Sequence, residues 1–196
     1  DSLRATSTMS RSPARRPTTA GDAMERLVLG GGCFWCVEGA LKGLRGVSEV
    51  IPGYSGGHVD DPTYEQVCGK RTGHAEVVLV SFDPEVISRR QLFDVFFCIH
   101  DSTQLNRQGN DVGPQYRSII LHSNQEQREE ALAVIEEISD DYADPIVTEV
   151  VPLERFWSAE NYHVNYYSNN PNNPYCQIVV SPKLAKVRAR FSHLYG

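Results

Sequence analysis

Apolar residues follow two periodicities along this chain, and together they predict a mixed fold. Short apolar runs, several of them alternating and rich in β-branched residues, predict strands at residues 26–29, 47–54, 75–82, 117–121 and 148–153. Apolar positions at helical spacing predict helices at residues 33–43, 88–100, 124–139, 157–167 and 183–191. Strands and helices alternate without a strictly parallel pattern, so we expect an α+β fold built as a two-layer α/β sandwich.

Polar stretches separate these elements without dividing the chain. Residues 58–72 and 168–174 are expected to be irregular, and so is the C-terminal tail. Residues 101–115 form a long polar loop, and long ordered loops often carry function. Residues 1–24 contain four Arg but almost no large apolar side chains, which predicts a disordered or extended tail. With no repeat or linker after it, residues 25–196 are expected to form a single domain.

Charge and composition argue against two classes of partner. The formal net charge is −6 and the basic clusters are short, so we expect no nucleic-acid binding. No apolar run approaches the roughly 18 residues of a membrane-spanning helix, so we expect no membrane partner. The five cysteines are odd in number and irregularly spaced, unlike the framework of a secreted disulfide-rich protein. We therefore expect a cytoplasmic protein with working thiols. We also expect a monomer.

A glycine-rich turn carries the most distinctive chemistry. Residues 30–32 are all glycine, and they lead directly into Cys33 at the start of the predicted helix 33–43. A thiol at a helix N-terminus feels the positive end of the helix dipole, which stabilises the nucleophilic thiolate. The glycines allow a tight turn and the close approach of a substrate. Phe34 and Trp35 add two large apolar groups beside the thiol.

A second thiol follows at the spacing of a redox pair. Cys36 lies one helical turn after Cys33, on the same face, as in Cys-X-X-Cys enzymes. A thioredoxin-like disulfide oxidoreductase is therefore one alternative, and a zinc-binding interaction module is another. The nearest further zinc ligands, Cys68 and His74, form no recurrent pair, so we expect no metal. Cys68 and Cys98 lie in apolar stretches, where buried structural thiols are expected.

Five sequence blocks, taken in order, resemble one enzyme family. The first is Gly-Cys-Phe-Trp at residues 32–35, at the start of a helix. The others lie at residues 62–68, 72–76, 100–118 and 159–163. In this order they resemble the A-type peptide methionine sulfoxide reductases over residues 26–180. The downstream blocks favour this family over a disulfide oxidoreductase.

The resemblance implies a function and a nucleophile. Members of this family reduce methionine-S-sulfoxide, free or in proteins, to methionine, and such enzymes reverse the oxidation of methionine. A ferredoxin-like core without cofactor or metal is implied as well. By position, Cys33 matches the nucleophile, while Phe34 and Trp35 match the pocket for the substrate's S-methyl group.

The same resemblance assigns the groups around the sulfoxide oxygen. This oxygen is a poor leaving group until it gains a proton, so a nearby acid is needed. Glu76 matches that acid, and burial would raise its pKa so that it keeps a proton. Tyr64 and Tyr116 match donors that steady charge on the oxygen. Asp111 matches a loop acid beside them.

The thiols complete the implied cycle. Oxygen transfer leaves a sulfenic acid on Cys33, which a second thiol converts into a disulfide. The commonest family form has Gly at the position of Cys36 and a resolving cysteine near the C-terminus. This chain has both Cys36 and Cys176, and we favour Cys36 as the first resolver with Cys176 as relay or alternative. The resemblance implies that thioredoxin or a similar dithiol reduces the disulfide.

Overall fold

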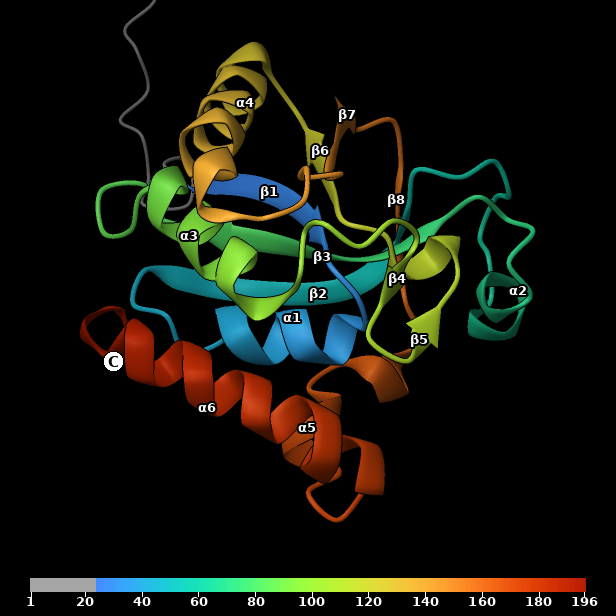
Figure 1. The fold of residues 1–196 in the computed structure, drawn as a ribbon. Helices are drawn as coiled ribbons and strands as arrows, with labels where there is room; N and C mark the ends of the chain where they lie inside the picture. The colour runs from blue at the N-terminus through green and yellow to red at the C-terminus, as the bar shows by residue number, and fades with distance from the viewer. Residues whose placement is uncertain (1–23) are drawn as a thin grey trace, which may run out of the picture.

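A six-stranded sheet forms the centre of the fold (Figure 1). The computed structural model describes residues 24–196, so all but the last residue of the tail expected at 1–24 lies outside the described residues. The strands of the sheet are β1 (Glu25–Gly30), β2 (Val47–Ser55), β3 (Ala75–Phe82), β6 (Ile119–His122), β7 (Glu149–Pro152) and β8 (Phe156–Ser158). The helices are α1 (Phe34–Leu41), α2 (Tyr64–Cys68), α3 (Arg89–Ile99), α4 (Gln125–Ile138), α5 (Tyr166–Asn169) and α6 (Ser181–Arg190). No helix between residues 24 and 196 combines the length and apolar character needed to cross a bilayer.

The four central strands have the ferredoxin-like arrangement that we expected. They lie in the order β6-β1-β3-β2, and each pairs antiparallel with its neighbour. α1 links β1 to β2, and α3 lies between β3 and β6 in the chain. β7 adds a parallel strand beside β6, and β8 adds an antiparallel strand beside β2. The α+β sandwich is therefore confirmed.

Strand alternation decides which side chains lie under the helices. On β1, Leu27 and Leu29 join the main core with α1, α3 and α6, whereas Val28 joins a smaller cluster on the opposite face. On β3, Val78 belongs to the main core. Since side chains two residues apart share a face, Glu76 points to the same side as Val78. The pleat of β3 thus places a carboxyl group on the face that α1 covers.

The helix expected at residues 157–167 is wrong. Phe156–Ser158 instead form β8, which pairs with Gly53–Ser55 of β2. A 3₁₀ turn at Asn161–His163 and the short helix α5 follow. Asn165 has a φ of 56°, a left-handed conformation that cannot continue a right-handed helix. The aromatic residues whose spacing suggested one helix therefore belong to three separate elements.

The long polar loop after α3 has its own internal order. β4 (Arg107–Gln108) pairs with β5 (Asp111–Val112) in a short hairpin, and a 3₁₀ turn at Pro114–Tyr116 follows. Gln108 is buried, and its amide group bonds both the N–H and the carbonyl of Asp101. The loop is thereby closed on itself and carries Asp111 and Tyr116 back toward the sheet.

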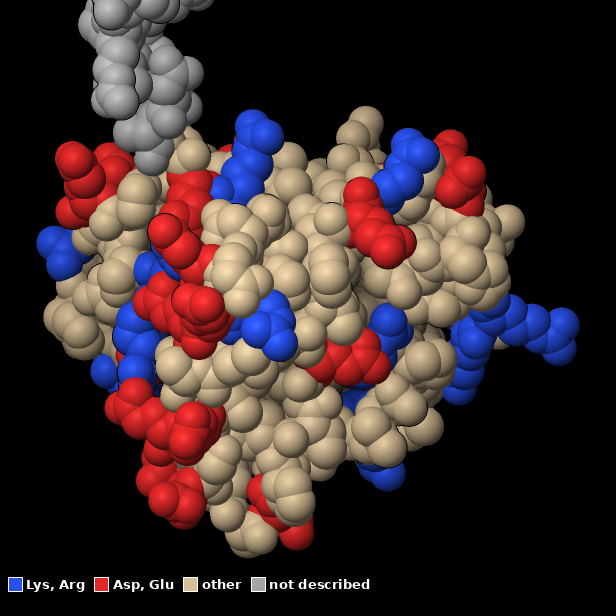
Figure 2. All heavy atoms as spheres, turned by 90° about the horizontal axis from the view of Figure 1, so that it is seen from above, with Lys and Arg blue, Asp and Glu red and all other residues tan. Residues whose placement is uncertain are grey.

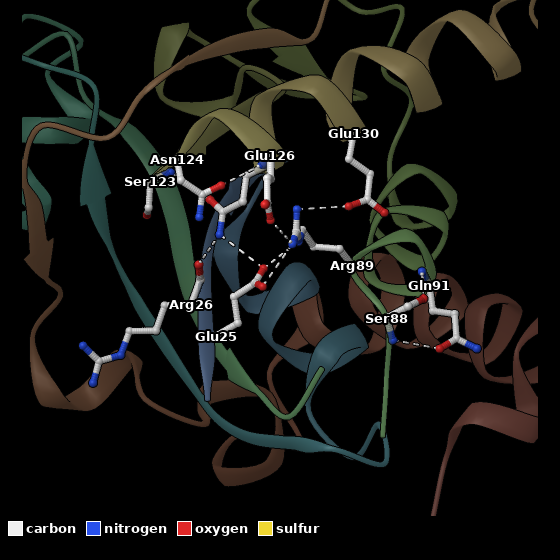
Figure 3. A network of polar contacts seen from close by, with 10 residues as sticks. Glu25, Arg26, Ser88, Arg89, Gln91, Ser123, Asn124, Glu126 and Glu130 are labelled. Carbon is white, nitrogen blue, oxygen red and sulfur yellow. Dashed lines mark hydrogen bonds and ion pairs between the residues drawn. The ribbon is translucent and has the colours of Figure 1, made fainter. Parts of the chain in front are cut away.

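Arg89 of α3 connects this helix to β1 and α4 through ion pairs (Figure 3). Its guanidinium lies 2.7 Å from Glu25 of β1 and 3.2 Å from Glu130 of α4, with Glu126 at 3.5 Å. Figure 2 shows acidic side chains gathered on this side of the molecule. One partly buried cation therefore holds together carboxylates that would otherwise repel one another.

We expect Arg89→Met to lower the free energy of unfolding by about 2 kcal/mol, because it leaves the partly buried Glu25 without its cation. Urea unfolding followed by circular dichroism measures the loss. Arg90→Met is the matched control: Arg90 is more exposed and pairs with Asp94 and Glu137 at the surface, so its loss is smaller. Equal losses in the two variants would contradict the role given to Arg89.

Candidate active site

The turn between β1 and α1 places Cys33 at the start of a helix. Cys33 is the N-cap of α1, with an extended backbone. Gly32 has a φ of +84°, and its N–H donates to the carbonyl of Tyr116. At Gly31, an added Cβ would lie 2.8 Å from the ring of His100. Both positions therefore require glycine, one for its backbone angle and one for the space that His100 occupies.

The buried environment of Cys33 favours the protonated thiol over the thiolate. Only 7% of the residue is exposed. Burial, the hydrogen bond with the Cys36 thiol and the nearby Glu76 raise the pKa of Cys33 well above its usual value. The backbone N–H of Trp35 acts in the opposite direction, as expected at a helix N-terminus, but it is the weaker effect. The surroundings of Cys33 therefore favour the thiol, in contrast to the effect of the helix N-terminus alone.

Cys36 has the opposite tendency. The hydrogen bond from Cys33 lowers the pKa of Cys36, against the effect of burial, and Lys183 adds to the lowering. The two thiols are hydrogen-bonded to each other one helical turn apart, and all five cysteines are free. Within this pair, Cys33 is therefore the thiol that holds its proton more tightly.

Glu76 lies on β3 directly beneath the start of α1. Its side chain is 1% exposed, and its Oε1 accepts a 3.2 Å hydrogen bond from the backbone N–H of Phe34. Burial raises the pKa of Glu76 to about 8, although the Phe34 N–H acts to lower it. Asp111 and Cys36 add to the increase. A carboxyl group next to Cys33 is thus protonated at neutral pH, which is the state a proton donor needs.

Two tyrosines and an aspartate reach the same place from distant segments. Tyr64 begins α2, Tyr116 ends the 3₁₀ turn after β5, and Asp111 begins β5. Burial, and after it the carboxyl group of Glu76, raises the pKa of both phenols. Both phenols therefore stay protonated and can donate a hydrogen bond. Asp111 accepts a 2.6 Å hydrogen bond from the hydroxyl of Tyr175.

The two aromatic residues after Cys33 have different surroundings. Phe34 is fully buried, and its ring lies 5.8 Å from Tyr54. Trp35 is half-buried and stacks on Tyr166, with ring centroids 3.7 Å apart and an angle of 6°. Tyr175 meets the indole edge-on at 5.8 Å. The apolar wall beside Cys33 is therefore completed by residues of the C-terminal segment.

The remaining thiols differ from the sequence expectation. Cys176 is fully buried in the same core cluster as Cys33 and Cys36, and Cys36 contributes to raising the pKa of Cys176. Cys68 and Cys98 are only half-buried, so the expectation of buried structural thiols is wrong for both. Cys68 lies beside the hydroxyl of Tyr64, and Cys98 lines a cleft between α3, α4 and α6.

That cleft has a volume of about 1080 Å³, but it is not the place where the candidate residues meet. Its walls carry opposite charges, with Lys183, Lys186 and Arg190 on α6 and acidic residues on the facing segments. The predicted site residues are absent from its lining. Between residues 24 and 196, no three His, Cys, Asp or Glu side chains gather as the ligands of a metal ion would.

Two residues of the site were missed by the sequence reasoning. Tyr175 bonds Asp111, and His163 accepts a 3.1 Å hydrogen bond from the indole N–H of Trp35. The block at residues 159–163 contains His163 but gave it no role, and Tyr175 was not singled out at all. The missing signal is spatial, because it depends on the C-terminal segment folding back over α1.

Comparisons with known proteins point to one family. A family model described as peptide methionine sulfoxide reductase matches residues 25–194. A relative named peptide methionine sulfoxide reductase MsrA, from Haloquadratum walsbyi, is 55% identical over 168 residues, which is 86% of this chain and 97% of the relative. A protein of the same name from Saccharolobus solfataricus is 54% identical over 168 residues, covering 86% of this chain and 95% of that protein.

A solved structure gives the same result. Mxr1 from Saccharomyces cerevisiae in its reduced form has a TM-score of 0.75 at 34% sequence identity, covering 79% of this chain and 90% of that one. The family match spans every candidate residue from Cys33 to Cys176. This chain therefore belongs to the peptide methionine sulfoxide reductase family of the A type, and it is an enzyme that reduces methionine-S-sulfoxide to methionine.

Proposed function

We propose that Cys33 is the nucleophile of this reduction and that Glu76 supplies the proton to the sulfoxide oxygen. One observation carries the proposal: the hydrogen bond from the Phe34 N–H fixes a buried, protonated carboxyl group beside the thiol. Phe34 and Glu76 are 42 positions apart in the sequence, and they meet because β3 runs beneath the start of α1. The nucleophile is thus held at the start of a helix and the acid on a strand, both of them rigid parts of the fold.

The first step transfers one oxygen atom. The sulfur of Cys33 attacks the sulfoxide sulfur while Glu76 protonates the sulfoxide oxygen, which forms a transient S–S bond and a hydroxyl group on the substrate sulfur. The hydroxyl group then moves to the Cys33 sulfur as the S–S bond breaks, with its electron pair staying on the methionine sulfur. The proton of the Cys33 thiol restores the carboxyl group of Glu76. The thiol and the sulfoxide become a sulfenic acid and a thioether, so atoms and charge balance. A resting thiol with a raised pKa suits this scheme, because the reaction needs that proton as well as the sulfur.

The surrounding residues fit a methyl sulfoxide group. Tyr64 and Tyr116 keep their phenol protons and can donate to the oxygen as charge develops on it. The half-buried face of Trp35 and the buried ring of Phe34 offer an apolar wall for the methyl group. We assign Asp111 an indirect contribution, since its carboxylate is engaged by the Tyr175 hydroxyl.

The second step forms a disulfide. Cys36 is already hydrogen-bonded to Cys33, and its lowered pKa favours the thiolate that attacks a sulfenic acid. Attack forms the Cys33–Cys36 disulfide and releases water. Cys176, buried in the same cluster, then exchanges with that disulfide to give Cys36–Cys176 and a restored Cys33 thiol. Cys36 is therefore the first resolver and Cys176 the relay.

An external dithiol ends the cycle. Mxr1 of Saccharomyces cerevisiae has been solved in a complex with Trx2. We propose that a thioredoxin likewise reduces the disulfide of this chain, becoming oxidised itself while two cysteine thiols are regenerated.

We expect Cys33→Ser to lower the formation of methionine by at least about a thousandfold, because a hydroxyl cannot replace the thiol as nucleophile and oxygen acceptor. Amino-acid analysis of the product with methionine-S-sulfoxide as substrate measures this. Cys98→Ser serves as the matched control and should retain activity, since Cys98 lines the separate cleft. Normal turnover by Cys33→Ser would overturn the assignment of the nucleophile.

We expect Glu76→Ala to lose about a hundredfold or more in kcat/KM, whereas Glu76→Gln should stay within about tenfold because its amide can still donate. Below a pH of about 8 the carboxyl group carries its proton, and above it the proton is lost. The kcat/KM of the wild type should therefore fall as the pH rises through about 8, and Glu76→Gln should lack this decrease. Equal rates for the two variants would remove Glu76 from the acid role.

We expect Cys36→Ser to release about one methionine per chain and then stall with thioredoxin as reductant, because the sulfenic acid on Cys33 loses its first resolver. Cys176→Ser should instead accumulate the Cys33–Cys36 disulfide in the first turnover. Single-turnover assays followed by mass mapping of the cysteines distinguish the two. Normal cycling by Cys36→Ser would make Cys176 the first resolver.

A further inference from the structure

His163 occupies the centre of an aromatic cluster behind the proposed substrate pocket. It is fully buried, and it follows β8 in a 3₁₀ turn that no step of the mechanism uses. Its ring lies 4.9 Å from Phe34, 4.6 Å from Tyr64 and 4.1 Å from Tyr162, measured between centroids. The imidazole thus contacts Phe34 and Tyr64, two residues of the proposed substrate pocket, but it takes no part in the proposed reaction.

The hydrogen bond with Trp35 fixes the protonation of this imidazole. An indole N–H can only donate, so Nδ1 of His163 must be the acceptor at 3.1 Å. The ring proton then lies on Nε2. Burial lowers the pKa of His163, which keeps the ring neutral and Nδ1 free to accept. A protonated imidazole, with donors at both nitrogens, could not make this bond.

Packing alone does not account for an imidazole at this position. Nε2 is buried and has no hydrogen-bond partner within the described part of the chain. An apolar side chain of similar volume would fill the same space without leaving a polar atom unpaired. The feature that only the imidazole supplies is the acceptor for Trp35.

The other ring contacts of Trp35 are apolar. Tyr166 covers one face of the indole and Tyr175 meets its edge, and neither contact engages the indole N–H. The bond to Nδ1 is the directional contact, because it points the indole N–H at one atom. The bond therefore restrains the side-chain torsions of Trp35 to those that direct the indole N–H at His163.

We propose that His163 is a positioning residue that fixes the orientation of the Trp35 indole and thereby the shape of the pocket for the substrate's methyl group. This inference rests on the proposed placement of Trp35 in the substrate pocket. It predicts that the loss of the acceptor weakens the binding of the sulfoxide and leaves the chemistry of Cys33 and Glu76 largely intact.

The kinetic test compares two variants of similar size. His163→Leu removes the acceptor, and we expect KM for methionine-S-sulfoxide to rise about tenfold with a smaller change in kcat. His163→Asn retains an acceptor near the place of Nδ1, and its KM should stay within about threefold of the wild type. In a Trp35→Phe background, which has no N–H to donate, the two variants should no longer differ. Equal KM values for His163→Leu and His163→Asn, or a difference that persists with Trp35→Phe, would overturn the proposal.

A second measurement needs no variant. In the ¹⁵N-labelled wild-type enzyme at pH 7, we expect the nuclear magnetic resonance shifts of His163 to report a proton on Nε2 and a bare Nδ1. A proton on Nδ1 would overturn the proposal, whatever the kinetics show. Normal turnover by Cys33→Ser would instead overturn the proposed function, so the two failures are distinguishable.

Discussion

The hydrogen bond between the Phe34 amide and Glu76 is the contact on which the site depends. It uses an N–H that the start of α1 leaves without an intrahelical partner, and it gives a buried carboxyl group one of the few partners available to it. One weak contact thereby sets the position of the helix that carries the thiol and the position of the acid. Neither group would have a defined place relative to the other if β3 were shifted by one residue, because Glu76 would then face away from α1.

The electrostatics of the site follow from burial more than from the helix dipole. The N-terminus of α1 does favour negative charge, but the removal of Cys33 from water and the neighbouring Glu76 outweigh it. The result is a site with two protons at rest, one on sulfur and one on the carboxyl group. Oxygen transfer from a sulfoxide needs a proton at the sulfoxide oxygen, and the carboxyl group of Glu76 holds one.

The sequence predicted most of the fold, since the strands and helices depend on local patterns, and its resemblance to one enzyme family predicted the function. The periodicities of β1, β3, α3 and α4 are strong, and Ser88 caps α3 through a capping box. The pattern of β3 alone gave no reason to bury Glu76, because alternation shows which residues share a face but not which face is covered. The role of His163 and the strand β8 could not be predicted, since both depend on the C-terminal segment packing against residues more than 100 positions earlier.

The turn before Cys33 has a consequence for how this gene can vary. Every single-base change that alters a glycine codon and keeps the chain intact introduces a side chain with a Cβ. At Gly31 that atom would strike the ring of His100, and at Gly32 it would meet Gln108 and an unfavourable backbone angle. His100 and Gln108 are themselves buried and hydrogen-bonded on two sides. The turn and the loop beneath it can therefore change only together.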